Sequence, residues 1–282
     1  MVTKKKSSKK DACFWIFKLI EKFVDSMRKV LSLKLFEFLK RWLLTLGNCG
    51  FYVASGLALL IGIIAAIRME SFGVFATAIG FAVGFFILQY VAIRFAKAGD
   101  KLIENNETSL SSSAFLDSVA LLSMIGGALI FLYYIYFAIK VGNIGPFIIG
   151  LGAFIFFELI AILSLNPKSI TVNVVSETSA GQEAIGIMTF FMKTVMKLVP
   201  ILFGLGVIIG TFMMLIHSFG LFKEGLGMSI AWANVNSDMS MVALAALLPF
   251  LAYIAFVFVF LIIDIYRAIL AIPQKLDNLG KK

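Results

Sequence analysis

The chain has 282 residues, of which 61% are hydrophobic and 15% charged, and its mean hydropathy is +0.99. Soluble domains contain about 45–50% apolar residues, so this composition excludes a soluble globular protein. Only helices and closed barrels satisfy their backbone hydrogen bonds inside a bilayer, and the apolar segments lack the alternation typical of barrel strands. The sequence therefore predicts an all-α integral membrane protein.

The net charge of +9 is concentrated at the N-terminus. Residues 1–44 carry 12 Lys and Arg against 4 acidic residues, which is +8, and leave +1 for all the rest. No basic and aromatic recognition module accompanies this segment, so we expect no nucleic-acid partner.

Apolar side chains recur at helical spacing over residues 13–44, with a phase slip near Ser32. Such a segment is suited to lie in the headgroup plane as an amphipathic helix, attracted by the phospholipids of the anionic cytoplasmic leaflet. We interpret the segment as a positive-inside topogenic signal with an interfacial anchor, and the alternative is that its apolar face docks onto a partner protein. The residues expected at the membrane interface are Trp15, Lys18, Lys22, Arg28, Lys29, Lys40, Arg41, Trp42 and, farther along the chain, His217 and Trp232.

Six later segments are each long enough to cross the roughly 30 Å hydrocarbon core as helices. They cover residues 48–67, 73–95, 117–139, 145–165, 190–216 and 242–266. Of the 25 Lys and Arg residues, 22 fall on one side of these spans, and the positive-inside rule places that side, with both termini, in the cytoplasm. We expect the first span to be a retained signal anchor and the location to be a bacterial inner membrane.

The spans read as three tandem hairpins. Gly56, Gly62 and the Ser-Phe-Gly at 71–73 match Gly204, Gly210 and the Ser-Phe-Gly at 218–220, and a third copy lies between them. Chance similarity among apolar segments is the competing explanation. The predicted organisation is a basic and amphipathic segment (1–44), hairpin 1 (45–116), hairpin 2 (117–189) and hairpin 3 (190–282), the last with an external insertion at 221–241 that could form a short interfacial helix.

Small residues favour close helix packing in lipid. Gly80 and Gly84 form a G-x-x-x-G pair, and Gly204 and Gly210 lie in the fifth span. We expect these glycines to pack the hairpins of one chain together, with a homodimer face as the alternative.

Glu158, Lys193 and Lys197 lie inside or near predicted spans, where ionisable residues are candidates for function. The two lysines share a helix face because they are four residues apart, and Glu158 lies at a similar depth in the preceding span. We interpret the three as an intramembrane polar cluster that clamps hairpins 2 and 3 together. The alternative is an ion- or proton-coupled site. Asp264 is expected to pair locally with Arg267.

His217 is the only histidine and follows a long apolar run. The sequence near it contains no second histidine and no carboxylate, so a metal site is not expected and His217 is interpreted as a residue at the membrane boundary. Cys13 and Cys49 have no zinc-site spacing and no expected disulfide. No nucleotide-binding, metalloprotease or nucleophile motif occurs, and we expect no cofactor and no catalytic residue.

The connector at 166–186 alternates briefly like a strand at Ile170, Val172 and Val174, and it offers Ser179 and Gln182 as a capping box for the following helix. Together these features predict a non-enzymatic multi-pass membrane protein. Its expected role is an accessory or scaffolding subunit of a larger membrane complex, with other membrane subunits or a second copy as partners. The alternative is a transporter or channel for ions, lipids or small solutes.

Overall fold

The described chain is almost entirely helical. The computed structural model describes residues 15–142, 144–176 and 178–279, and six helices of this part are long and apolar enough to cross a membrane. They are α3 (Leu33–Arg68), α4 (Phe72–Asn105), α5 (Ser113–Val141), α6 (Gly145–Leu165), α7 (Ala180–Ser218) and α8 (Leu226–Leu279). The prediction of an all-α protein with six spans is confirmed, and the chain is a multi-pass membrane protein.

The chain divides into two compact units. The first contains the chain up to Phe36 together with Ser109–Thr178, and the second contains Glu37–Thr108 and the chain from Ser179 onward. Helices α5 and α6 thus belong to the first unit, whereas α4, α7, α8 and nearly all of α3 belong to the second.

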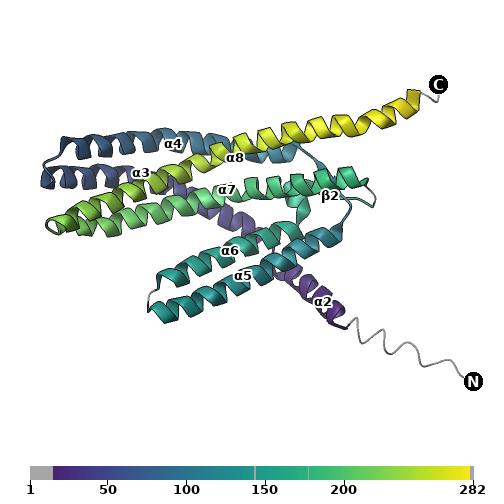
Figure 1. Ribbon diagram of the computed structural model, residues 1–282, viewed down its shortest axis with the longest axis horizontal. Coiled ribbons are helices and arrows are strands. Elements are labelled where there is room, and N and C mark those ends of the chain that lie inside the picture. The colour runs from purple at the N-terminus through teal and green to yellow at the C-terminus, as the bar shows by residue number, and fades with distance from the viewer. Residues whose placement is uncertain (1–14, 143, 177, 280–282) are drawn as a thin grey trace, which may run out of the picture. The chain divides into compact units, whose positions relative to one another are not determined.

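In the first unit, α5 and α6 form an antiparallel hairpin (Figure 1). The Phe131 ring stacks on Phe154 with centroids 5.5 Å apart. Gly150 lets the two backbones approach, because a Cβ atom added there would collide with the Tyr134 side chain. This unit also contains α2 (Trp15–Val30), whose Arg28 donates a hydrogen bond of 2.7 Å to Asp117 at the start of α5.

The amphipathic segment is interrupted where its apolar pattern slips. Helix α2 ends at Val30 and α3 begins at Leu33. From Leu33 the helix continues without a break to Arg68, so the amphipathic turns before residue 44 and the first apolar span are one helix. The C-terminal part of this helix is buried on one side and the N-terminal turns carry charged residues.

Short elements follow α4 and α6 in the chain. The strands β1 (Thr108–Leu110) and β2 (Val172–Val174) form a two-stranded sheet, and β2 follows a single 3₁₀ turn, η1 (Pro167–Ile170). The predicted strand is therefore present, although Ile170 closes the turn before it. The predicted capping box is confirmed as well, since the Ser179 hydroxyl accepts from the Gln182 N–H at 3.3 Å and the Gln182 side chain accepts from the Ser179 N–H.

The second unit is a four-helix arrangement in which α7 and α8 run antiparallel beside the α3–α4 hairpin (Figure 1). Its centre is filled by rings: Phe51 lies 5.9 Å from Phe85 and 5.8 Å from Phe203, and none of the three is more than 1% exposed. Close approach of backbones contributes too, because a Cβ atom added at Gly204 would collide with the backbone of Leu43 on α3.

The turn between α7 and α8 differs from the expectation of a separate interfacial helix. One 3₁₀ turn, η2 (Phe219–Phe222), follows α7, the chain reverses through Gly225 with a φ of +59°, and α8 then begins at Leu226. The expectation was wrong because the polar residues of 234–240 replace apolar ones along a helix without interrupting it. On the facing side of α7, Gly210 leaves room for the Val242 side chain.

Candidate functional site

Charged and polar side chains of three helices meet at one end of the second unit. We call this group the boundary cluster, because it lies where the apolar stretches of these helices begin or end. It consists of Glu37 and Lys40 of α3, Asp100 of α4 with Asn106 directly after this helix, and Lys193 and Lys197 of α7.

Lys40 and Asp100 form the closest ion pair of the boundary cluster. The Lys40 Nζ lies 2.7 Å and 2.8 Å from the two Asp100 carboxylate oxygens. The Lys40 side chain is 11% exposed and that of Asp100 is 34% exposed. Charge-assisted hydrogen bonds of this length are stronger than neutral ones, so this pair joins α3 firmly to α4.

Lys197 adds the third helix to the same carboxylate. Its Nζ lies 3.6 Å from Asp100 Oδ1 and 3.8 Å from Glu37 Oε1. The side chain is only 13% exposed, so this ammonium depends on these two carboxylates for compensation. Asp100 is the group that α3 and α7 share.

Lys193 is fully buried, and its Nζ donates to the backbone carbonyl of Asn106. Asn106 directly follows the last residue of α4, and its side chain also donates to the Leu102 carbonyl at 2.7 Å. A cation near the C-terminal carbonyls of a helix is favourable, because these groups lack partners within the helix and carry the negative end of its dipole. Lys193 therefore completes the end of α4.

The predicted partner of the two lysines, Glu158, lies on α6 in the first unit, whereas Lys193 and Lys197 lie in the second. One Glu158 carboxylate oxygen, Oε2, is buried without a hydrogen-bond partner among the described residues. The clamp between Glu158 and the lysines stays a prediction.

Sequence reasoning missed Asp100 as the partner of Lys40 and Lys197. Lys40 was assigned to the membrane interface from its place on an amphipathic helix, and Asp100 was given no role. Asp100 lies five residues after the end of the predicted second span, and Lys193 and Lys197 lie at the start of the fifth. All three are therefore expected near the same membrane surface, and this shared depth could have indicated that they are partners.

The boundary cluster contains three ammonium groups and two carboxylates, so it nearly neutralises itself. Within the described residues, no group of three or more His, Cys, Asp or Glu side chains could hold a metal ion. Its ion pairs and hydrogen bonds hold α3, α4 and α7 together at one end of the second unit.

The predicted interface residues of α2 are exposed. Trp15 is 64% exposed, and Leu19 and Phe23 follow it on the same face. The predicted interface cations that are exposed are Lys18, Lys22, Arg28 and Lys29 of α2 and Arg41 of α3, and Trp42 of α3 is exposed as well. Trp232, by contrast, is half-buried and packs against the core of the second unit.

Cys49 is exposed and free, and Cys13 lies outside the described residues, as do the first fourteen residues as a whole.

The predicted packing glycines differ among themselves. Gly204 and Gly210 meet Leu43 and Val242 in the second unit, whereas a Cβ atom at Gly80 or Gly84 would lie more than 4 Å from every described residue outside its own helical turn. An open groove of about 360 Å³ runs over Gly80 and Gly84, bordered by Leu88 of α4 and Ala243 of α8 among others.

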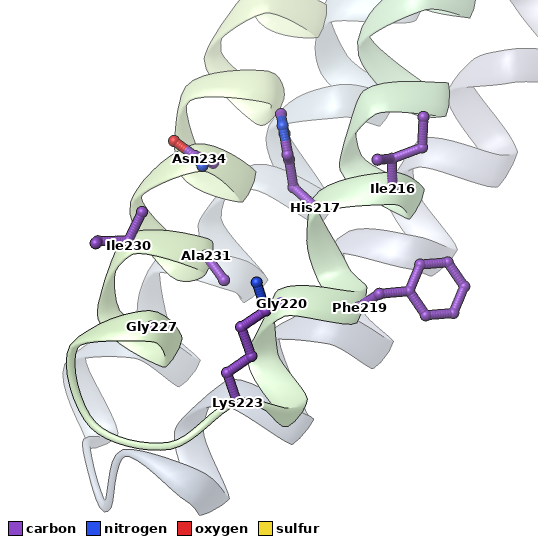
Figure 2. Close-up of a pocket in the computed structure, with 9 residues that line it drawn as sticks. All are labelled: Ile216, His217, Phe219, Gly220, Lys223, Gly227, Ile230, Ala231 and Asn234. Atoms are coloured by element: carbon purple, nitrogen blue, oxygen red, sulfur yellow. The ribbon is translucent and has the colours of Figure 1, made fainter.

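At the opposite end of the second unit, His217 has a partner that the sequence analysis did not anticipate. Its Nδ1 lies 2.7 Å from Asp238 Oδ2, on the next helix. The statement that no carboxylate is near His217 was wrong, because the antiparallel hairpin of α7 and α8 brings Asp238, from the other side of the turn, against it. His217 also lines a pocket at this turn, together with Lys223 and Asn234 (Figure 2).

A further local pair behaves as expected: Arg267 lies 3.3 Å from Asp264 on the same face of α8.

The fold and these sites define a class, the helical multi-pass membrane proteins with six spans. No protein family, curated protein or solved structure matches the chain.

Proposed function

We propose that this chain is a non-enzymatic accessory or scaffolding subunit of a larger membrane assembly. The observation that carries the proposal is the filled interior of the second unit. A transport path along the axis of its four helices would have to pass Phe51, Phe85 and Phe203, whose rings lie 5.8–5.9 Å apart and are at most 1% exposed. An interior packed in this way suits a rigid membrane-embedded body.

The N-terminal helix supports an anchoring role in this proposal. In α2, Trp15, Leu19 and Phe23 expose one apolar stripe, and exposed lysines and arginines accompany it. Such a helix binds anionic phospholipid surfaces through apolar burial and charge attraction together. We place it on the cytoplasmic leaflet, with both termini in the cytoplasm of a bacterial cell and the spans in its inner membrane.

The open groove over Gly80 and Gly84 supports contact with another membrane helix, either of a different subunit or of a second copy. Small residues that leave space for an incoming backbone are typical of helix interfaces in lipid. Here the space is left free by the helices of the second unit, since no other part of the described chain lies within 4 Å of a Cβ added at either glycine.

The test is purification of the full-length chain from its native membranes in mild detergent, with identification of co-purifying proteins. Gly80→Leu combined with Gly84→Leu fills the groove and should remove the partner. Gly56→Leu is the matched control, because Gly56 lies in the same unit, is exposed and has equally open space. A monomer that purifies without partners in the wild type contradicts the proposal.

Cysteine crosslinking separates the two kinds of partner. Gly80→Cys and Gly84→Cys are introduced with Cys13 and Cys49 replaced by serine, since Cys49 is itself exposed. A crosslinked homodimer assigns the groove to a second copy. A crosslink to another protein assigns it to a different subunit.

The second candidate function is transport of ions or small solutes, and Glu158 favours it. Its Oε2 is buried without a hydrogen-bond partner in the described residues, and an ionisable group within a membrane span is a candidate for a coupling site. Glu158→Gln distinguishes the two: a variant that keeps its partners but loses ion flux in reconstituted vesicles assigns the function to transport.

A further inference from the structure

The pocket at the α7–α8 turn has the composition of an anion site. It measures about 310 Å³ and is lined by residues of α7, η2, the turn and α8, which falls at the lower end of the roughly 300–1,000 Å³ typical of ligand pockets. Its polar lining consists of the His217 imidazole, the Lys223 ammonium and the Asn234 amide. Figure 2 shows the Lys223 side chain extending from the turn toward the side on which His217 and Asn234 lie.

Asp238 fixes the imidazole from behind. With His217 Nδ1 only 2.7 Å from Asp238 Oδ2, the ring donates its Nδ1 hydrogen to the carboxylate. Asp238 itself is 8% exposed. The other ring nitrogen, Nε2, is then the atom left for a ligand: it accepts a hydrogen bond in the neutral ring and donates one in the protonated ring. Its orientation is set by a buried carboxylate on the neighbouring helix.

The side chains of Lys223 and Asn234 make no polar contact that stabilises the fold of the described residues. Among the described residues, neither the Lys223 ammonium nor the Asn234 side chain has a hydrogen-bond or ion-pair partner. Arg68, the nearest cation of α3 at this end, is occupied differently: its Nη1 donates to the Leu221 carbonyl at 2.7 Å. The pocket thus holds one positive charge and donors that remain available.

The chemistry selects an anion over a metal ion. A cation would meet the charge of Lys223 and find a single imidazole nitrogen as its strong ligand, whereas a phosphate group can accept hydrogen bonds from Lys223 Nζ and Asn234 Nδ2 together. A protonated His217 would add a third donor at Nε2, with Asp238 compensating its charge at Nδ1.

The position of the pocket indicates where the phosphate comes from. Lys193 of the boundary cluster and His217 are 24 residues apart on α7, which is about 36 Å at roughly 1.5 Å per residue, slightly more than a hydrocarbon core of about 30 Å. With the boundary cluster at one membrane surface, the pocket lies at the headgroup level of the other. Apolar side chains surround it, with Phe219 and Ile230 both more than 60% exposed.

We propose that this pocket binds the phosphate group of a membrane phospholipid, through Lys223 and Asn234 as donors and His217 held in place by Asp238. The exposed Phe219 and Ile230 side chains lie against the acyl chains of the same lipid. The inference does not rest on the proposed function, because scaffolds and transporters both bind lipids.

The binding test uses the full-length chain in mild detergent, titrated with dioleoylphosphatidylglycerol and followed by native mass spectrometry. Lys223→Ala combined with Asn234→Ala should weaken binding about tenfold or more, as expected for loss of a charge-assisted and a neutral hydrogen bond. Lys140→Ala, which removes an exposed lysine at the turn of the other unit, should leave the affinity unchanged. Equal binding by the double variant, or by phosphate-free dioleoylglycerol, overturns the proposal.

The wild-type chain provides a second measurement that does not depend on any variant folding. Since His217 is the only histidine, ¹⁵N-histidine labelling yields one pair of ring nitrogen signals. Dioleoylphosphatidylglycerol should shift the Nε2 signal more than the Nδ1 signal, which Asp238 already holds. No shift overturns the proposal, and the same shift with inorganic phosphate at equal concentration overturns the assignment to a lipid.

Discussion

The two ends of the second unit use charged side chains in opposite ways. At the boundary cluster, Lys40 and Lys197 are paired with carboxylates and Lys193 donates to the end of α4. At the α7–α8 turn, Asp238 and His217 pair with each other, while Lys223 faces an open pocket. We call the end with the boundary cluster the closed end and the end with the α7–α8 turn the open end. The closed end is suited to hold helices together, and the open end is suited to bind a molecule from outside.

This difference follows from how many helices contribute. Three helices converge on Asp100, so each lysine of the boundary cluster has a partner within the unit. Few hydrogen-bonding groups of the cluster are left for a ligand. At the turn, the pocket is lined by residues of α7, η2, the turn and the start of α8, which are consecutive in the chain. Comparing the stability cost of changes at the two ends therefore tests the distinction.

The largest effect is expected for Gly204→Leu, beside the closed end. A side chain at this position must displace the backbone of Leu43, and backbone cannot yield as a flexible side chain can. We expect a loss of about 3 kcal/mol or more in the free energy of unfolding, measured by denaturation in mixed detergent micelles. Gly56→Leu, at the position that the predicted repeat aligns with Gly204, has open space around it and should change the free energy by less than about 0.5 kcal/mol. Equal costs would show that α3 and α7 do not depend on this approach.

Asp100→Ala is expected to have the next largest effect. The substitution leaves Lys40 without its carboxylate and Lys197 with only the more distant Glu37, and both lysine side chains are less than 15% exposed. Breaking a buried ion pair costs about 3–5 kcal/mol, and the 34% exposure of Asp100 reduces our expectation to about 2 kcal/mol. Asp264→Ala is the control, because that pair with Arg267 is exposed and should contribute less than about 0.5 kcal/mol.

The sequence was sufficient to predict the six spans and the capping box, because both depend on local composition. Each span is a continuous apolar stretch, and Ser179 and Gln182 are three residues apart. The same holds for the break near Ser32, where the helical phase of the apolar residues changes. Gly62 and Gly210, which the predicted repeat aligns, each leave room for the side chain of a residue on the following helix, Ala78 and Val242. The repeat itself stays a prediction.

The polar sites could not be predicted in the same way, because they depend on which helices are neighbours. Asp100 and Lys197 are almost a hundred residues apart, and the choice between Glu158 and Asp100 as partner of Lys197 cannot be made from depth alone. His217 and Asp238 are closer in sequence, but the expectation of a separate helix in the insertion at 221–241 hid that they lie on two neighbouring helices of one hairpin.

Arg68→Ala tests the connection between the two hairpins at the open end. Arg68 Nη1 donates to the carbonyl of Leu221, a residue that is 1% exposed. Hydrogen bonds that involve a charged group contribute about 1.5–3 kcal/mol, so we expect a cost of about 1.5 kcal/mol in the same unfolding assay. Lys140→Ala, at the position that the predicted repeat aligns with Arg68, removes an exposed cation and should have little effect. A cost below that of the control would mean that the α3–α4 and α7–α8 turns are held together by apolar packing alone.

The smallest effect on the free energy of unfolding is expected for Lys223→Ala. Its size decides whether the Lys223 ammonium is available to a ligand. Because Lys223 has no side-chain partner among the described residues, its removal should change the free energy of unfolding by less than about 0.5 kcal/mol. Lys40→Ala is the comparison at the closed end, where the same truncation leaves Asp100 with only the longer contact to Lys197 and should cost about 2 kcal/mol. If Lys223→Ala is as costly as Lys40→Ala, the lysine at the turn is part of the folded framework, and its charge is not available to a ligand. If it is nearly without cost, the charge at the turn is retained at no benefit to folding, which is the condition for a residue that serves binding.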